Sequence, residues 1–197
     1  MLAYIAEHLE EIRDLVISAL VLAFVFSYEG VSVKTIENFP YALFAISIAF
    51  LFHELAHRQT AKHFGCFARY KMWVQGLLLA LVFAILSNGS FVFAAPGAVV
   101  IHPRIDIWGR ITRLTKDEEG KIALAGPVMN LFLAIIFFIF YLIFALPIFY
   151  IATRINLWLC IFNLIPFPPL DGFSVFTWSR KVWLFVLAVA LLIFAIA

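Results

Sequence analysis

Long apolar runs constrain the fold of this chain more than any other feature of its sequence. Followed by eye, they lie at 15–28, 40–57, 72–88, 121–150, 155–165 and 181–197. A helix that crosses a bilayer needs about 20 mostly apolar residues, and the second and fourth runs are long enough. Because 65% of the 197 residues are hydrophobic and only 13% are charged, the surrounding medium must be mostly lipid. The sequence predicts an all-α polytopic membrane protein, a bundle of about five to six transmembrane helices.

The distribution of charge limits the partners and the location of the chain. The net charge of +2 is small and spread along the sequence, which argues against nucleic acid as a partner. We expect a single domain over 1–197, a multi-pass protein of the cell membrane with the lipid bilayer around it. A cleaved signal would begin with basic residues. This N-terminus instead carries four acids, Glu7, Glu10, Glu11 and Asp14.

Two polar segments indicate which side of the membrane is cytoplasmic. Segment 58–71 carries four basic residues and no acid, and 102–121 is the only long polar stretch. Short basic loops mark the cytoplasmic side, so we expect both segments there, with a cytoplasmic polar loop near 102–121. The stretch 72–101 must then cross the membrane an even number of times. A short helix with an extended return would satisfy this condition, and so would a re-entrant dip.

Residues 88–102 have the composition of strands rather than of a helix. Runs containing Phe, Val and Ile flank Pro96-Gly97, and Pro followed by Gly suits the centre of a type II turn. The segment predicts a small re-entrant β-hairpin near 90–101. Exposed strand edges are not tolerated in lipid, so the hairpin must pack inside the protein or line a cavity. Such an edge could pair with an unwound peptide through main-chain hydrogen bonds.

The strongest signal for a functional site is the pentapeptide from His53 to His57, which has the pattern H-E-x-x-H. Residues four apart share one face of a helix, so both imidazoles can reach one ion, with Glu54 beside them. Zinc lowers the pKa of a bound water to about 7, and a carboxylate can take its proton. We therefore expect one Zn²⁺ per chain and Glu54 as the catalytic base. The alternative is a helix end whose polar residues reach the membrane interface.

A catalytic zinc site uses three protein ligands and keeps one position open, so a third ligand is needed. Asp171 is the only Asp or Glu after Glu119, and three Pro residues within 166–169 end the helix before it. Broken backbone at membrane depth is tolerated only beside protein or a watery cavity, where a carboxylate can serve a site. We expect Asp171 to complete the metal site, the alternative being a solvated loop acid.

Two asparagines are candidates for contacts with a substrate. Asn163 lies in an apolar helix, one helix break before Asp171, and could donate to a developing oxyanion. An interhelical hydrogen bond explains it equally well. Asn130 lies four residues after Gly126, a spacing that favours close helix packing over a substrate contact.

Taken together, these segments resemble the site-2 protease family of intramembrane zinc metalloproteases. The match rests on 53–57, on the Gly-Pro-Val-Met-Asn segment 126–130 and on 163–172. It spans about 40–175, and the apparent hairpin is similar to that family's re-entrant β element. The chain differs from the family in lacking an inserted PDZ-like domain and in having the extra apolar run 72–88.

The resemblance implies a set of roles, and two other readings stay open. It implies zinc held by His53, His57 and Asp171, Glu54 as general base, and Asn163 near the substrate carbonyl. The implied substrates are transmembrane segments of other proteins. A non-proteolytic metal-binding membrane protein, such as a transporter or chaperone-like subunit, would keep the three ligands without needing the base. A protease with Glu as the third ligand is disfavoured, because the only later Glu residues lie in a charged loop.

Overall fold

The computed structural model describes residues 2–102, 104–105 and 111–197. Part of the predicted cytoplasmic loop near 102–121, at 103 and 106–110, lies outside the described residues. The described helices are α1 (Leu2–Ser27), α2 (Val33–His63), α3 (Val74–Leu86), α4 (Lys116–Phe144), α5 (Pro147–Asn163), α6 (Asp171–Trp178) and α7 (Arg180–Ile196). The short strands are β1 (Phe67–Met72), β2 (Gly97–His102), β3 (Arg104–Ile105) and β4 (Ile111–Thr112).

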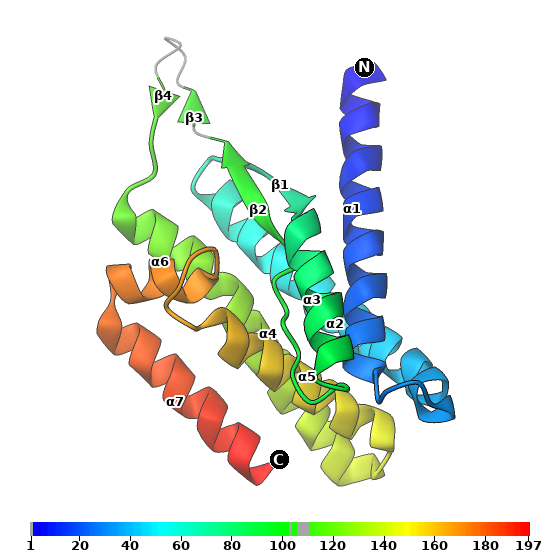
Figure 1. The fold of residues 1–197 in the computed structure, drawn as a ribbon. Helices are drawn as coiled ribbons and strands as arrows, with labels where there is room; N and C mark the ends of the chain where they lie inside the picture. Colours follow the sequence, from blue (N-terminus) through cyan, green and yellow to red (C-terminus); the bar gives the residue numbers. More distant parts are fainter. Residues whose placement is uncertain (1, 103, 106–110) are drawn as a thin grey trace.

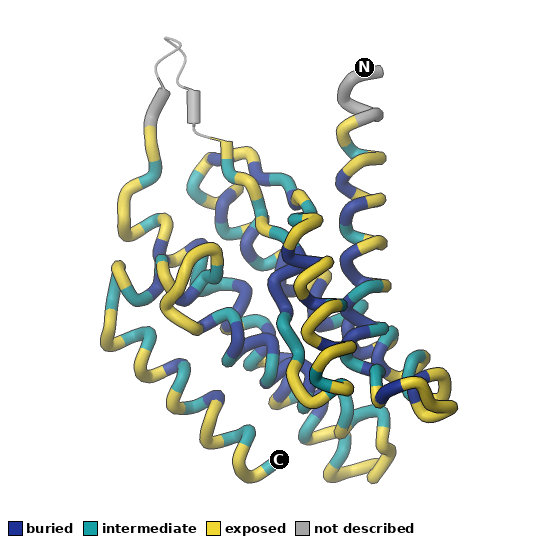
Figure 2. Tube along the Cα trace, viewed as in Figure 1, coloured by how far each residue is buried: buried dark blue, intermediate teal, exposed yellow. Residues whose placement is uncertain are grey.

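Helix α2 occupies the centre of the molecule (Figure 1). It packs against α1, α4 and α5 and also contacts β1 and β2, while α7 packs against α5 and α6. The buried residues concentrate where α2 meets its neighbours, whereas α7 and the outer side of α3 are largely exposed (Figure 2). The predicted helical architecture is confirmed. Helices α2 and α4 are each long and apolar enough to cross a membrane, judged by length and composition, and the larger number of spans stays a prediction.

The apolar run 121–150 is not one helix. Helix α4 begins at a capping box, in which Thr115 and Glu118 satisfy each other's backbone N–H groups, and it continues through Pro127. It ends where Ala145 adopts a left-handed conformation with φ 52°, and α5 starts two residues later with Pro147. A left-handed residue ends a helix and Pro suits the first helical position, so the chain reverses direction there.

The predicted hairpin near 90–101 is wrong in its pairing. Residues 91–96 form no strand, and β2 pairs antiparallel with β1, from Phe67 opposite His102 to Met72 opposite Gly97. Helix α3 and an extended return connect the two strands, so the chain leaves and re-enters the sheet at adjacent residues. Strand β1 lies partly in segment 58–71, which the sequence predicts as a short basic loop. Its basic residues Arg69 and Lys71 alternate with apolar residues along the strand.

Candidate metal centre and active site

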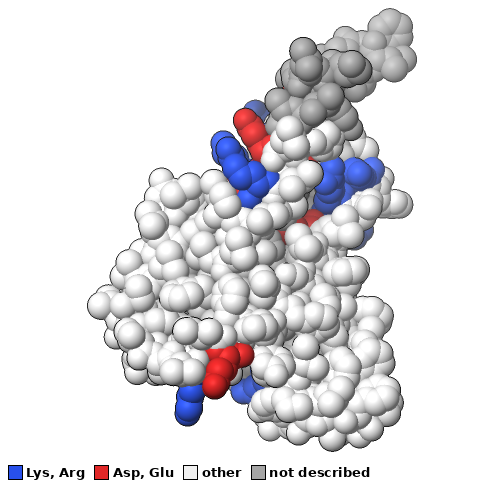
Figure 3. All heavy atoms as spheres, turned by 90° about the vertical axis from the view of Figure 1, so that its right-hand side faces the viewer, with Lys and Arg blue, Asp and Glu red and all other residues white. Residues whose placement is uncertain are grey.

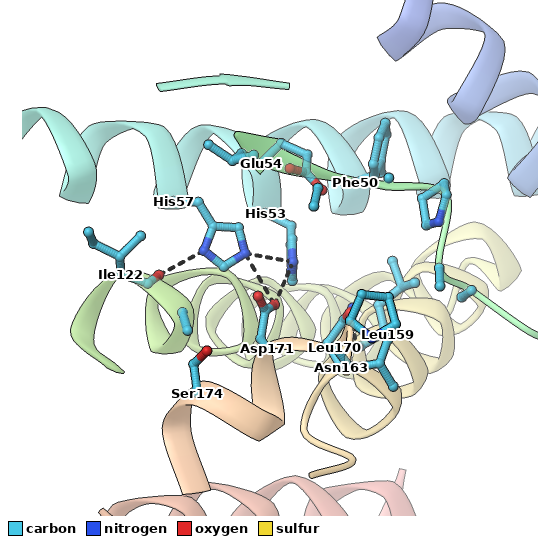
Figure 4. A pocket seen from close by; sticks show the side chains of 18 of the residues that line it. Phe50, His53, Glu54, His57, Ile122, Leu159, Asn163, Leu170, Asp171 and Ser174 are labelled. Atoms are coloured by element: carbon cyan, nitrogen blue, oxygen red, sulfur yellow. Dashed lines mark hydrogen bonds and ion pairs between the residues drawn. The ribbon is translucent and has the colours of Figure 1, made fainter. Parts of the chain in front are cut away.

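The two histidines of the pentapeptide lie on one face of α2 and point into the space between α2, α4 and α6 (Figure 4). Both are buried, and their Nε2 atoms are 3.0 Å apart. Asp171, the first residue of α6, places its Oδ2 atom 3.2 Å from each Nε2. The structure thus brings together the three residues that the sequence nominated as metal ligands, from segments more than 100 residues apart.

Hydrogen bonds on the far side of each ring fix the two imidazoles. His53 Nδ1 lies 2.6 Å from Asn130 Oδ1, and His57 Nδ1 lies 2.7 Å from the carbonyl oxygen of Ile122. Both partners are acceptors. A carbonyl oxygen can only accept, and the Asn130 oxygen is identified because the amide nitrogen donates to the carbonyl oxygen of Ala49. Each Nδ1 therefore carries the proton, which leaves the Nε2 lone pairs facing each other as metal ligands require.

Helix α4 approaches the imidazoles closely because it has a glycine at that point. A Cβ atom on Gly126 would overlap His57 Nε2 and would lie 2.6 Å from His53 Nε2. Read from the sequence, Gly126 suggested helix packing. The structure shows that what packs against it is the pair of candidate ligands, a role that no local signal identifies.

The loop before α6 carries Asp171 to the histidines. Helix α5 ends at Asn163, and the indole N–H of Trp183 in α7 donates to the carbonyl oxygen of Leu164, 2.7 Å away. Gly172 lies against the Leu164 backbone, where a Cβ atom would have no room. The broken helix is therefore held at both sides, and the carboxylate is not a free loop acid.

The donor set fits a zinc ion. Ligands at about 2.1 Å in a tetrahedral arrangement lie about 3.4 Å from one another. The observed separations among the three candidate ligand atoms are 3.0, 3.2 and 3.2 Å. Two imidazoles and one carboxylate also match the chemistry of catalytic zinc sites, which use three protein ligands. Among the described residues, this His–His–Asp group is the one that could hold a metal ion.

A cavity of about 380 Å³ opens beside this group. Glu54 lies in its wall next to the histidines, and its buried Oε2 atom has no hydrogen-bond partner among the described residues. Leu159, Asn163 and Leu170 line the opposite side (Figure 4), and the chain from 94 to 101 forms another wall. The cavity is thus lined by the candidate ligands, by the Glu54 carboxylate and by residues of β2.

The two asparagines have different surroundings. Asn163 lines the cavity, and one N–H of its amide donates to the carbonyl oxygen of Leu159, 3.0 Å away. Asn130 is fully buried behind His53 and also donates to Asn156 Oδ1, 3.2 Å away. Asn130 is not among the residues that line the cavity. Its contact with a substrate stays a prediction. Asn156 escaped notice in the sequence, although an amide within an apolar helix was the available signal.

Among the described residues, β2 pairs with no strand other than β1, and most of its residues line the cavity. In two antiparallel strands, opposite residues alternate between pairs that exchange main-chain hydrogen bonds and pairs that do not. In the second kind of pair, the N–H and C=O groups point away from the partner strand. Tyr70 and Met72 donate their backbone N–H groups to side chains of α1, so Tyr70–Val99 is a pair of this kind. The N–H and C=O groups of Val99, and by alternation those of Ile101, therefore point away from β1. Both residues line the cavity.

Two curated proteins resemble the chain over most of its length. It is 40% identical over 181 residues, 89% of this chain and 88% of the other, to "Putative zinc metalloprotease MJ0611" of Methanocaldococcus jannaschii. It is 32% identical over 151 residues, 69% of this chain and 67% of the other, to "Putative zinc metalloprotease YwhC" of Bacillus subtilis. No protein-family profile matches the chain, and no solved structure matches it.

Proposed function

The chain belongs to the zinc metalloprotease family of these two relatives, and on that premise we propose that it cleaves membrane proteins inside the bilayer. Its reaction would be hydrolysis of peptide bonds within or near transmembrane segments, as in the site-2 proteases. The observation that carries the proposal is the convergence of His53, His57 and Asp171 beside Glu54 at one cavity. The cofactor is one zinc ion, which this His–His–Asp group can bind.

Several features support a membrane location for this chemistry. On the face drawn in Figure 3, charged side chains gather at two ends of the molecule, and the broad band between them is uncharged. Large apolar side chains are exposed along the helices, including Leu86 at 79% and Phe185 at 69%. A water-soluble surface would not carry so much exposed apolar area. With α2 and α4 long enough to cross a bilayer, a multi-pass cell-membrane protein accounts for these features together.

Within this proposal, each residue of the site has a task. A bound zinc ion supplies Lewis-acid chemistry, which polarises a carbonyl and makes water acidic. Asn130 and the Ile122 carbonyl hold the imidazoles in the ligand tautomer. Glu54, whose Oε2 atom has no hydrogen-bond partner among the described residues, receives the proton from water and returns it to the leaving amine. Asn163 has one amide N–H left to donate toward the substrate carbonyl.

The open edge of β2 gives a way to hold the substrate. A helical substrate cannot be cleaved while its carbonyl groups are bonded along the helix, so it must unwind first. An unwound segment can pair with the outward N–H and C=O groups of Val99 and Ile101, which lie on the cavity wall. Such pairing reads main chain rather than side chains. Substrates would then be selected by how readily they unwind.

The edge hypothesis can be tested with a matched pair of substitutions. Val99→Pro removes one outward N–H and leaves the ladder with β1 intact, because Pro is tolerated on the open side of an edge strand. Val99→Ala keeps that N–H. We expect the first to reduce cleavage of a reconstituted transmembrane substrate at least tenfold and the second to stay within about threefold, from the loss of about one main-chain hydrogen bond and the alignment it sets. Equal rates in the two variants would disprove strand pairing.

The protease assignment itself is tested at Glu54. We expect Glu54→Gln, in proteoliposomes with a model transmembrane substrate, to retain about one zinc per chain and to lose cleavage by at least a thousandfold. Asp171→Ala should lose both zinc and cleavage. A metal transporter or chaperone-like subunit would not need Glu54, so undiminished activity in Glu54→Gln would refute the protease. Full zinc occupancy in Asp171→Ala would remove Asp171 from the ligand set.

A further inference from the structure

Helix α1 carries a polar stripe on the side that faces the protein. Glu11, Asp14 and Ser18 follow the i, i+3, i+7 spacing of one helix face and are all buried, at 4%, 6% and 0% exposure. The outward side of the helix exposes large apolar residues, such as Leu9 and Ile12 with 62% and 56% exposure, beside the charged Glu10 and Arg13. This pattern is the reverse of a helix on a water-soluble protein, and the mechanism proposed above does not use the three polar residues.

Each member of the stripe bonds strand β1. Glu11 Oε1 accepts from the backbone N–H of Tyr70 at 3.0 Å, and Asp14 Oδ2 accepts from that of Met72 at 3.3 Å. Ser18 Oγ lies 2.8 Å from the hydroxyl oxygen of Tyr70. Burial raises the pKa of the Tyr70 hydroxyl, so it stays neutral in this contact. Three hydrogen bonds thus attach one helix face to alternate residues of one strand.

Glu11 also connects the strand to the helix that carries the candidate ligands. Its Oε1 atom accepts from Arg58 Nη1 at 3.2 Å, and Arg58 directly follows His57 in α2. One carboxylate therefore joins α1, β1 and α2. Removing it would leave a backbone N–H and a guanidinium without their shared acceptor, which is costly in a buried place.

We propose that Glu11, Asp14 and Ser18 are positioning residues for the protease, an anchor that sets the height of the β1–β2 pair relative to the metal ligands. The carboxylates also occupy the main-chain donors on the outer edge of β1. An extended peptide can then pair only with β2, on the side that faces the cavity. The hydrogen-bonded register between β1 and β2 fixes Val99 relative to β1. The anchor of β1 therefore determines which peptide bond of a substrate paired with Val99 lies beside the metal ligands. The role in cleavage rests on the proposed function, whereas the attachment of β1 does not.

The attachment is tested by amide hydrogen exchange on the full chain in detergent micelles. We expect Glu11→Ala to speed exchange of the Tyr70 amide at least tenfold, because its acceptor is gone. Glu11→Gln retains an oxygen acceptor and should stay within about threefold of wild type. Glu10→Ala makes the same charge change at an exposed site on α1 and serves as the control. An unchanged Tyr70 amide in Glu11→Ala would overturn the anchor. If that variant does not fold, Asp14→Ala and the Met72 amide decide the same question.

The role in cleavage is tested with a transmembrane peptide in liposomes. We expect Glu11→Ala to raise KM on the order of tenfold and to spread cleavage over neighbouring peptide bonds, while its zinc content stays unchanged. Glu11→Gln should again give one main product. Cleavage at a single bond with wild-type KM, despite fast Tyr70 exchange, would refute the positioning role. If the wild-type chain cleaves nothing, the proposed function fails, and the exchange measurement still decides whether the anchor exists.

Discussion

Replacing Gly126 by Ala should separate metal binding from folding in this protein. The added Cβ atom would lie 2.6 Å from His53 Nε2, whereas Cβ atoms essentially never approach another heavy atom within 3.0 Å. His53 Cε1 would be closer still, at 2.5 Å, so the His53 ring must retreat by about 0.5 Å to reach 3.0 Å, and His57 must move further. Zinc sites hold their ligand distances to within about 0.2 Å. Because Asn130 and Ile122 hold the imidazoles from behind, the rings cannot retreat without losing those bonds.

We expect Gly126→Ala to weaken zinc binding at least a hundredfold, which corresponds to about 2.7 kcal/mol. The metal-free protein should lose only about 1 kcal/mol, because the roughly 1 kcal/mol by which Ala favours a helix over Gly offsets part of the two hydrogen bonds that the displaced rings give up. The assay is a chelator-buffered zinc titration of the detergent-solubilised protein, with bound metal measured by mass spectrometry and Tm recorded with and without zinc. Ala125→Gly makes the opposite propensity change one residue away. Wild-type zinc affinity in Gly126→Ala would refute the clearance argument.

Substitutions at three further residues test the supports of the site. Asn130→Ala should lower zinc affinity about 10–100-fold through the lost bond to His53, while Asn130→Asp, which keeps an acceptor, should lose less in the same titration. Trp183→Phe removes the donor to the Leu164 carbonyl oxygen, so it should lower stability by about 1 kcal/mol, measured by Tm, and weaken zinc binding, measured by titration. An unchanged zinc affinity would show that the loop holds Asp171 without this bond. Thr115→Ala should lower stability by about 1 kcal/mol through the lost cap of α4 and leave zinc affinity unchanged; a change in affinity would mean that the cap reaches the site.

The candidate site was largely predictable because its strongest elements are local or chemically isolated. The spacing of His53 and His57 puts both imidazoles on one helix face wherever that helix lies. Asp171 stood out because a lone acid in an apolar region demands an explanation. Zinc as cofactor is confirmed by the metalloprotease family and by the His–His–Asp group. The supports of the ligands were not predictable, because the bonds from Asn130 and the Ile122 carbonyl depend on how α4 lies against α2.

The prediction of the strand pairing was wrong because the true partner strand is distant in sequence. The sequence around Pro96-Gly97 predicts a turn, and local rules offer 90–95 as the nearest partner for the strand that follows. The actual partner, β1, lies before α3 and carries Arg69 and Lys71, which resemble loop residues in a scan for basic segments. Its position depends on Glu11 and Asp14, more than 50 residues earlier. A pairing that depends on buried acids in another helix has no signature in the strand itself.

Metal binding and helix packing share one interface in this protein. His53 and His57 lie where α2 meets α4. The third candidate ligand, Asp171, comes from α6, which packs on α4 and α7. An ion held there would connect α2 to α6, so binding free energy would add to the stability of the folded chain. The same closeness explains why Gly126 and Asn130 look like packing residues in the sequence. They are packing residues, and Gly126 lies against both imidazoles while Asn130 bonds that of His53. A substitution that loosens the α2–α4 contact should therefore reduce zinc affinity even when it touches no ligand.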